Sequence, residues 1–135
     1  MFEETTKILV CDDTISARRV VEFSLKKLGF TNIIQAEDGE EALEIYEREL
    51  KGDNPVGLVI CDWMMPNRTG FELLNKIRKD DQDKQIPFIF ITVKQEKKDA
   101  DRIYAAGASA VLAKPFKAGE LKSALEKAFE DSNAA

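Results

Sequence analysis

Short apolar runs alternate with amphipathic segments five times along the chain. The clearest runs are continuously apolar and span residues 8–11, 56–61, 88–91 and 110–113. A continuous apolar run predicts a strand that is buried on both faces, and such strands need helices on both sides of the sheet. The pattern therefore predicts a three-layer, doubly wound α/β sandwich with a parallel sheet.

The segments between the runs carry apolar residues at three- and four-residue spacing, as amphipathic helices do. The last segment shows this spacing best, at Leu121, Ala124, Leu125, Ala128 and Phe129. Gly29 is expected to end the first helix. Five βα units joined by short right-handed crossovers leave few topologies, and the flavodoxin-like (βα)5 sheet order 2-1-3-4-5 is a common one. In that order, ligands bind outside the carboxyl ends of the first and third strands.

Length and composition indicate one globular domain. A chain of 135 residues can form a single core that buries about two-thirds of the surface of the unfolded chain. The hydrophobic fraction of 44% and the charged fraction of 33% are those of an ordinary soluble protein. We expect a single domain over residues 1–135, with a core over about 6–130 and loose termini, and no attached output module.

The charge balance argues against nucleic-acid binding. The chain has 20 Lys and Arg against 25 Asp and Glu, for a net charge of -5, whereas sequence-independent binding relies on phosphate neutralisation.

No apolar stretch approaches the roughly 20 residues that span a bilayer, and the acidic start, Met1-Phe2-Glu3-Glu4, is unlike an export signal. We expect a cytoplasmic monomer without membrane insertion.

Cysteine and histidine usage narrows the metal chemistry. Cys11 and Cys61 end two of the predicted strands, so we expect buried, reduced thiols rather than a disulfide. The chain has no His, which removes the commonest transition-metal ligand and general base. Any bound metal should therefore be hard and liganded by oxygen.

Polar side chains follow the predicted strands, at the point where each apolar run ends. Asp12 and Asp13 follow the first run, Asp62 the run 56–61, Thr92 the run 88–91, and Lys114 the last. Carboxyl ends of parallel strands share one rim, so acid, hydroxyl and ammonium groups should converge there. Taken alone, Asp12-Asp13 is a turn or helix cap, Thr92 a strand-end hydroxyl and Lys114 a surface charge; only their joint placement favours a site.

Three carboxylates on one rim repel, by about 1 to 4 kcal/mol for each pair at about 4 Å. A cation should relieve this repulsion, and Mg²⁺ suits an all-oxygen site with few protein ligands. Ca²⁺ would need six to eight oxygens, and the chain has no EF-hand loop. The sequence therefore predicts Mg²⁺.

Asp62 is the expected nucleophile of the site. It stands alone on the middle strand, whereas the adjacent Asp12 and Asp13 have the arrangement of a metal-holding pair. A carboxylate beside a divalent metal can attack phosphorus and form an acyl phosphate. Lys114 would neutralise the phosphoryl oxygens, and Thr92 would donate a hydrogen bond to one of them.

With these residues, the chain resembles a two-component response-regulator receiver domain in its CheY-like, single-domain form. The resemblance covers nearly the whole chain. It rests on five segments in order, which are Cys11-Asp12-Asp13, Asp62-Trp63-Met64-Met65-Pro66 with Gly70 following, Ile91-Thr92, Gly107-Ala108-Ser109 and Lys114-Pro115-Phe116. Each segment is a weak signal alone, but all of them together at strand ends are a strong one.

The resemblance implies a role for each residue of the site. Asp62 would accept a phosphoryl group from the phosphohistidine of a histidine kinase, and Thr92 and Lys114 would bind that group. Asp13, Asp62 and the backbone carbonyl of Met64 would ligate Mg²⁺, and Asp12 would act through a metal-bound water. The Lys114-Pro115 peptide bond would be cis.

The resemblance also implies how the phosphorylated protein would pass on its signal. The phosphorylated form would change its binding to a partner protein through the fourth helix, fifth strand and fifth helix, in chemotaxis or another two-component pathway. Thr92 and residue 111 form the switch of the family, but Val111 stands where an aromatic residue usually turns inward. Val cannot fill that space, so the aromatic form of the switch is not expected, and a shift of the loop after Thr92 is the alternative.

Two further departures concern phosphoryl lifetime and access. Met64 and Lys94 occupy the positions that flank the attacking water in the family, so the lifetime should differ from that of relatives. Val93 replaces a small residue after Thr92 and would crowd the site. On the first helix, Arg18, Arg19, Lys26 and Lys27 are read as its solvated face, with kinase docking as the lesser alternative.

Other functions remain in competition at this point. A phosphorelay intermediate would pass the phosphoryl group to a histidine phosphotransfer protein, and the sequence does not separate it from the leading hypothesis. A phosphatase with an Asp nucleophile usually has a second Asp two residues later, where this chain has Met64. A flavin or nucleotide binder would show a Gly-rich loop after the first strand, which is lacking. Beyond phosphorylating and dephosphorylating itself, the chain is not expected to be an enzyme.

Overall fold

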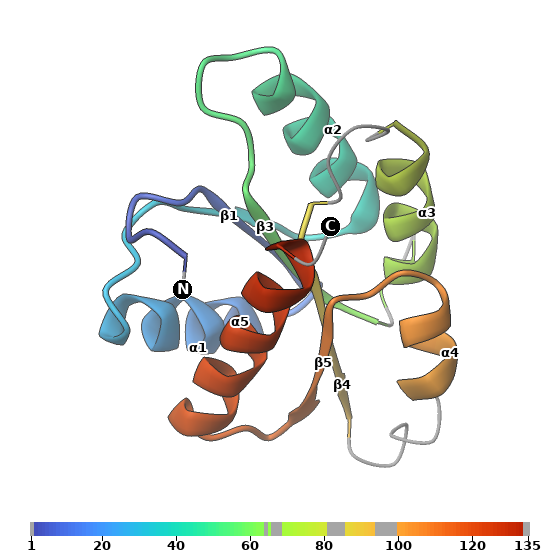
Figure 1. Ribbon diagram of the computed structural model, residues 1–135. Helices are drawn as coiled ribbons and strands as arrows, with labels where there is room; N and C mark the ends of the chain where they lie inside the picture. Colours follow the sequence, from blue (N-terminus) through green and yellow to red (C-terminus); the bar gives the residue numbers. More distant parts are fainter. Residues whose placement is uncertain (1, 64, 66–68, 81–85, 94–99, 134–135) are drawn as a thin grey trace.

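The computed structural model describes residues 2–63, 65, 69–80, 86–93 and 100–133. Strands and helices alternate through these residues (Figure 1). The strands are β1 (Ile8–Cys11), β2 (Ile33–Ala36), β3 (Leu58–Asp62), β4 (Phe88–Val93) and β5 (Ala110–Lys114). The helices are α1 (Ile15–Lys27), α2 (Gly39–Leu50), α3 (Gly70–Asp80), α4 (Ala100–Ala105) and α5 (Ala118–Asn133).

The five strands form one parallel sheet in the order β2-β1-β3-β4-β5, which confirms the predicted flavodoxin-like topology. Cys11 of β1 is paired with Cys61 of β3. The next residues, Asp12 just after β1 and Asp62 at the end of β3, therefore lie at the same level. The chain order places the site between β1 and β3, where the connections diverge to opposite faces.

Alternate residues of the strands contribute to two separate hydrophobic cores, one on each face of the sheet. Leu9, Cys11 and Phe90 pack with apolar residues of α2, α3 and α4 on one face of the sheet. Ile8 and Val10 pack with residues of α1 and α5 on the other, and Figure 1 shows these two helices together on one side. The continuously apolar strands are thus explained by burial on both faces, as predicted.

Three of the strands run further than the apolar runs that predicted them. β3 ends at Asp62, β4 at Val93 and β5 at Lys114, so Asp62, Thr92 and Lys114 belong to strands, whereas Asp12 and Asp13 follow the end of β1 at Cys11. The ladder continues because its hydrogen bonds join backbone groups whatever the side chain, as where Trp63 N–H donates to the carbonyl of Ile91 at 3.1 Å. Asp62, Thr92 and Lys114 are therefore held by the sheet itself.

Gly70 allows α3 to begin directly against the end of β3. A Cβ atom at this position would lie 2.6 Å from the backbone oxygen of Asp62 and 2.6 Å from Cε1 of Phe90. Neither neighbour can move without disturbing the sheet or the core. Gly70 is thus required for the close approach of helix and strand beside the site.

Local signals fix the helix ends. Asp38 Oδ1 accepts a hydrogen bond from Glu41 N–H at 2.8 Å at the start of α2, and Glu41 Oε1 accepts one from Glu37 N–H at 3.1 Å. The first bond is an N-cap that satisfies an otherwise unpaired helix donor, and the second holds the residue before the cap. Gly29, with φ of 103°, follows α1 as predicted, since a left-handed residue commonly ends a helix.

The two cysteines are buried free thiols, as expected. Cys11 Sγ lies 3.2 Å from Met65 Sδ and donates to the carbonyl of Asp38 at 3.3 Å. Burial raises the pKa of Cys61, and its hydrogen bond with Cys11 raises it further. Both thiols therefore act as core residues behind the acidic rim.

Across the ranges described above, no helix has the length and apolar character needed to cross a membrane.

Candidate functional site

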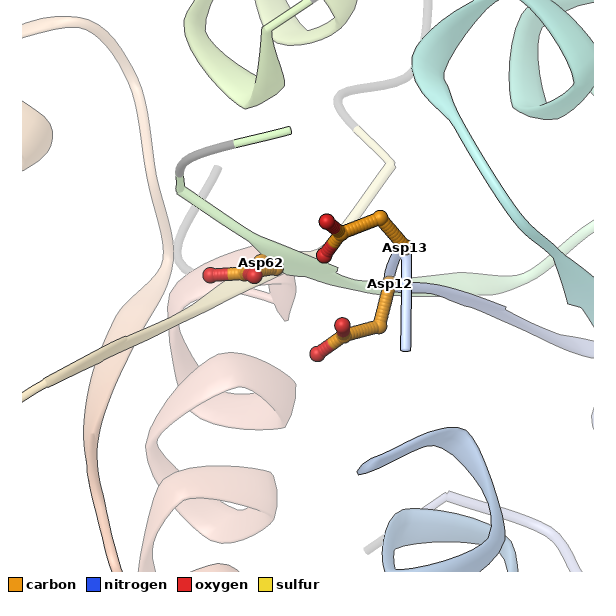
Figure 2. A group of neighbouring side chains, drawn as sticks. All are labelled: Asp12, Asp13 and Asp62. Carbon is orange, nitrogen blue, oxygen red and sulfur yellow. The ribbon is translucent and has the colours of Figure 1, made fainter. Parts of the chain in front are cut away.

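Three carboxylates meet at the carboxyl ends of β1 and β3 (Figure 2). One oxygen from each of Asp12, Asp13 and Asp62 lies within 4.8 Å of the others. Asp12 is 2% exposed, Asp62 is half-buried and Asp13 is exposed. The predicted convergence is confirmed, and the group offers only hard oxygen ligands.

Lys114 brings a positive charge to the same rim from the end of β5. Its Nζ donates to Asp12 Oδ2 at 3.0 Å and lies 3.6 Å from Asp62 Oδ2. Burial by itself would lower the pKa of Lys114, but the hydrogen bond to Asp12 and the charge of Asp62 outweigh it, and the pKa is raised. Lys114 is therefore a fully charged ammonium at neutral pH. The Lys114-Pro115 peptide bond is cis, as the resemblance implied.

Thr92 lies near the end of β4, next to β3 in the sheet. It is 1% exposed, and its Oγ1 has no hydrogen-bond partner among the described residues. Asp62 pairs with Ile91, the residue before Thr92. A buried hydroxyl without a partner is costly to keep, so its place at a strand end beside the acidic group supports a role toward a ligand.

The acidic group fits Mg²⁺ by the chemistry of its donors. One Lys114 compensates only part of the charge of three carboxylates, and the remaining repulsion favours a dication. Carboxylate oxygens open to solvent on one side suit an ion that keeps several waters. Met64, whose carbonyl was the fourth predicted ligand, lies outside the described residues, as does Lys94.

Arg18 corrects one expectation. The sequence predicts that it lies on the solvated face of the first helix, and its neighbour Arg19 is indeed exposed. Arg18 is instead half-buried, and its Nη1 donates to the backbone oxygen of Asp12 at 2.7 Å. Helical periodicity gave no signal for this contact, because a long side chain near the edge of a helix can turn either to solvent or to the protein.

Tyr104 makes a second contact that the sequence does not predict. Its hydroxyl accepts a hydrogen bond from the backbone N–H of Val111 at 3.2 Å, and one from Lys127 Nζ at 2.8 Å. Lys127 Nζ also lies 4.2 Å from the centre of the Tyr104 ring. An aromatic side chain thus contacts position 111 after all, but it comes from α4.

Trp63 lies half-buried directly after Asp62. Its ring packs edge-on against Phe90, with centroids 5.0 Å apart, and against Phe71, with centroids 5.8 Å apart. These contacts hold the indole beside the acidic group. Its fluorescence should therefore respond when the charge of the site changes.

Comparisons with known proteins find similar proteins over almost the whole chain. The family model described as the response regulator receiver domain matches residues 8–126. Chemotaxis protein CheY-3 of Vibrio cholerae is 37% identical over 130 residues, which are 96% of each chain. Chemotaxis protein CheY of Pseudomonas aeruginosa is 36% identical over 127 residues, covering 94% of this chain and 98% of that protein.

Solved structures show the same fold. A response regulator receiver domain protein from Clostridium thermocellum superimposes with a TM-score of 0.81 at 26% identity, covering 95% of this chain and 97% of that one. Chemotaxis response regulator CheY4 of Vibrio cholerae gives a TM-score of 0.76 at 31% identity, with coverage of 92% and 98%. Similarity thus extends over almost the full length in both cases.

Proposed function

The chain belongs to the family of response regulator receiver domains, and from this membership we propose that Asp62 is the phosphoacceptor of a two-component signalling pathway. The observation that carries the proposal is the position of Asp62, in the acidic group with Asp12 and Asp13 and 3.6 Å from Lys114. CheY-like receiver domains are signalling proteins rather than classical enzymes. This chain would accordingly catalyse only its own phosphorylation and dephosphorylation.

Mg²⁺ is the proposed cofactor, held by Asp13, Asp62 and the backbone carbonyl of Met64, with Asp12 acting through a bound water. Receiver domains generally bind this ion at an acidic pocket, and the donor set described above suits it. When bound, the ion would neutralise the negative charge that gathers as a phosphate approaches the carboxylates.

Asp62 would perform the transfer itself. One of its carboxylate oxygens forms a bond to phosphorus while the bond from phosphorus to the imidazole nitrogen of a kinase phosphohistidine breaks, and the released imidazole takes a proton from solvent. Charge spreads over the three other phosphoryl oxygens in the transition state. Lys114 would neutralise one of these oxygens. The hydroxyl of Thr92, which has no partner among the described residues, would donate a hydrogen bond to another.

The signal would leave through the face formed by α4, β5 and α5. Bonding of Thr92 to the phosphoryl group would draw the end of β4 inward, and Val111 lies on the neighbouring strand, paired with Phe90. A downstream protein that binds this face would then sense phosphorylation. A histidine kinase and such a target are the proposed partners, in the cytoplasm and in a chemotaxis-like pathway.

Phosphorylation by a small donor tests the proposal. The protein is incubated with acetyl phosphate and Mg²⁺ and its intact mass is measured; a gain of one phosphoryl group is expected. Asp62→Asn should abolish the gain, since the amide is not a nucleophile. Asp53→Asn, at an exposed acid between α2 and β3, is the matched control and should retain it. Absence of any gain in the wild type, or a gain that survives Asp62→Asn, contradicts the assignment.

A further inference from the structure

Arg18 links α1 to the end of β1. Its Nη1 donates to the backbone oxygen of Asp12 at 2.7 Å, and its Nε donates to Gln35 Oε1 at 2.9 Å. Gln35 lies on β2, and its Nε2 donates to Glu22 Oε2 on α1 at 3.1 Å. The guanidinium is therefore fixed at two atoms, by one group at the end of β1 and one on β2.

The other contacts of Asp12 show what the Arg18 bond adds. Asp12 N–H donates to the carbonyl of Ala36 at 3.1 Å. Asp12 Oδ1 accepts from Thr14 N–H at 3.0 Å, and Oδ2 accepts from Lys114. These bonds fix the amide and the carboxylate, and the bond from Arg18 fixes the carbonyl.

The carbonyl of Asp12 belongs to the peptide unit that leads into Asp13. Because a peptide unit is planar and rigid, holding this carbonyl also sets the direction in which the chain enters Asp13. Asp13 is exposed, so packing does little to orient it. The contact with Arg18 is therefore well placed to orient the outermost carboxylate of the acidic group.

We propose that Arg18 is a positioning residue of the site: it holds the Asp12-Asp13 peptide so that both carboxylates lie ready for a divalent cation beside Asp62. The inference rests on the proposed Mg²⁺ site and adds a residue to it. Arg18 touches neither the cation nor the phosphoryl group in this role. It acts through the backbone, as residues behind metal ligands commonly do.

Whether loss of Arg18 raises or lowers the Kd for Mg²⁺ distinguishes a positioning role from an effect of its charge. A guanidinium close to the site repels a dication, so the loss of its charge alone would strengthen Mg²⁺ binding. The loss of a positioning contact would weaken binding instead, because Asp13 would have to be ordered by the ion. Arg18→Gln tests which effect prevails. Arg19→Gln is the matched control, since it removes the same charge from the exposed neighbour.

Mg²⁺ titrations of the full chain, followed by Trp63 fluorescence, provide the measurement. Arg18→Gln should raise the Kd about tenfold, at the lower end of what loss of a residue behind a metal ligand costs. Arg18→Lys should recover little of this, because an ammonium cannot reproduce the two-atom fork. Arg19→Gln should leave the Kd unchanged or slightly lower. An unchanged or lower Kd for Arg18→Gln would overturn the inference.

Two further variants distinguish a failure of the Arg18 inference from a failure of the proposed metal site. Gln35→Ala removes the second anchor of the guanidinium and leaves Arg18 in place, so it should also raise the Kd for Mg²⁺, by a smaller factor. This variant tests the inference even where Arg18→Gln folds poorly. If Gln35→Ala does not raise the Kd, the positioning role of Arg18 is contradicted. Asp13→Asn reports on the site itself. If Asp13→Asn binds Mg²⁺ like the wild type, the proposed metal site fails; if it loses binding while Arg18→Gln does not, only the role of Arg18 fails.

Discussion

Replacing Asp13 with Asn should make the metal-free protein more stable and the metal-bound protein less so. The change removes one of three negative charges whose oxygens lie within 4.8 Å of one another. At about this separation, two charges repel by roughly 1 kcal/mol in water and about 3.5 kcal/mol at an effective dielectric constant of 20. Since Asp13 is exposed, the lower figure applies to its pairs with Asp12 and Asp62, and the two pairs together give about 1 to 2 kcal/mol.

Thermal unfolding with and without Mg²⁺ measures both halves of this prediction. For a domain of this size, about 1 to 2 kcal/mol corresponds to a rise in Tm of roughly 3 to 8 °C without metal. The wild type should gain about 2.7 kcal/mol when Mg²⁺ is at a hundred times its Kd. Asp13→Asn should gain much less, so the order of the two Tm values reverses on adding Mg²⁺.

The reversal is the decisive observation, because a simple loss or gain of packing would shift both conditions alike. Asp53→Asn serves as the control and should change Tm little in either condition, since it lies in an exposed loop. If Asp13→Asn is destabilised without metal, or responds to Mg²⁺ as fully as the wild type, the repulsion argument is wrong.

Three predictions concern the scaffold of the fold. Gly70→Ala should cost about 1 to 3 kcal/mol in urea unfolding and slow phosphorylation, because its Cβ meets backbone and Phe90 at 2.6 Å; unchanged stability would contradict the close approach. Asp38→Ala should cost about 1 kcal/mol through the lost helix cap, without loss of phosphorylation. Contacts with Lys7 and then Arg48 lower the pKa of Glu49 below 4.5, so this pairing stabilises the fold above that value and its contribution is lost as pH falls through the lowered pKa. Glu49→Gln should therefore be less stable than the wild type at neutral pH and equal to it in strong acid, and a difference that persists in acid would refute the ion-pair origin.

The sequence was sufficient to predict the architecture because buried positions recur with a regular spacing of apolar residues along the chain. Continuously apolar strands and amphipathic helices identify a two-sided parallel sheet, and few topologies then remain. The meeting of Asp12, Asp13, Asp62 and Lys114 followed from topology alone, since residues at the carboxyl ends of parallel strands share a rim. This part of the site required no knowledge of side-chain conformation.

What the sequence could not predict depends on side chains that cross between elements. Arg18 and Arg19 are adjacent and chemically identical, yet only Arg18 turns inward, toward a carbonyl and an amide that three-dimensional packing brings within reach. Tyr104 reaches Val111 from a different element for the same reason. Periodicity identifies the face of a helix on which a residue lies, but it does not identify the partner of a long side chain.

The contact between Tyr104 and Val111 has a consequence for grafting experiments. Introducing an aromatic residue at position 111 alone would add a large ring where a phenol from α4 already binds the backbone of the same residue. Positions 104 and 111 should therefore show epistasis: each exchange is unfavourable singly, and the two are tolerated when made together. Chimeras between this chain and relatives with an aromatic β5 need to carry both positions as one unit.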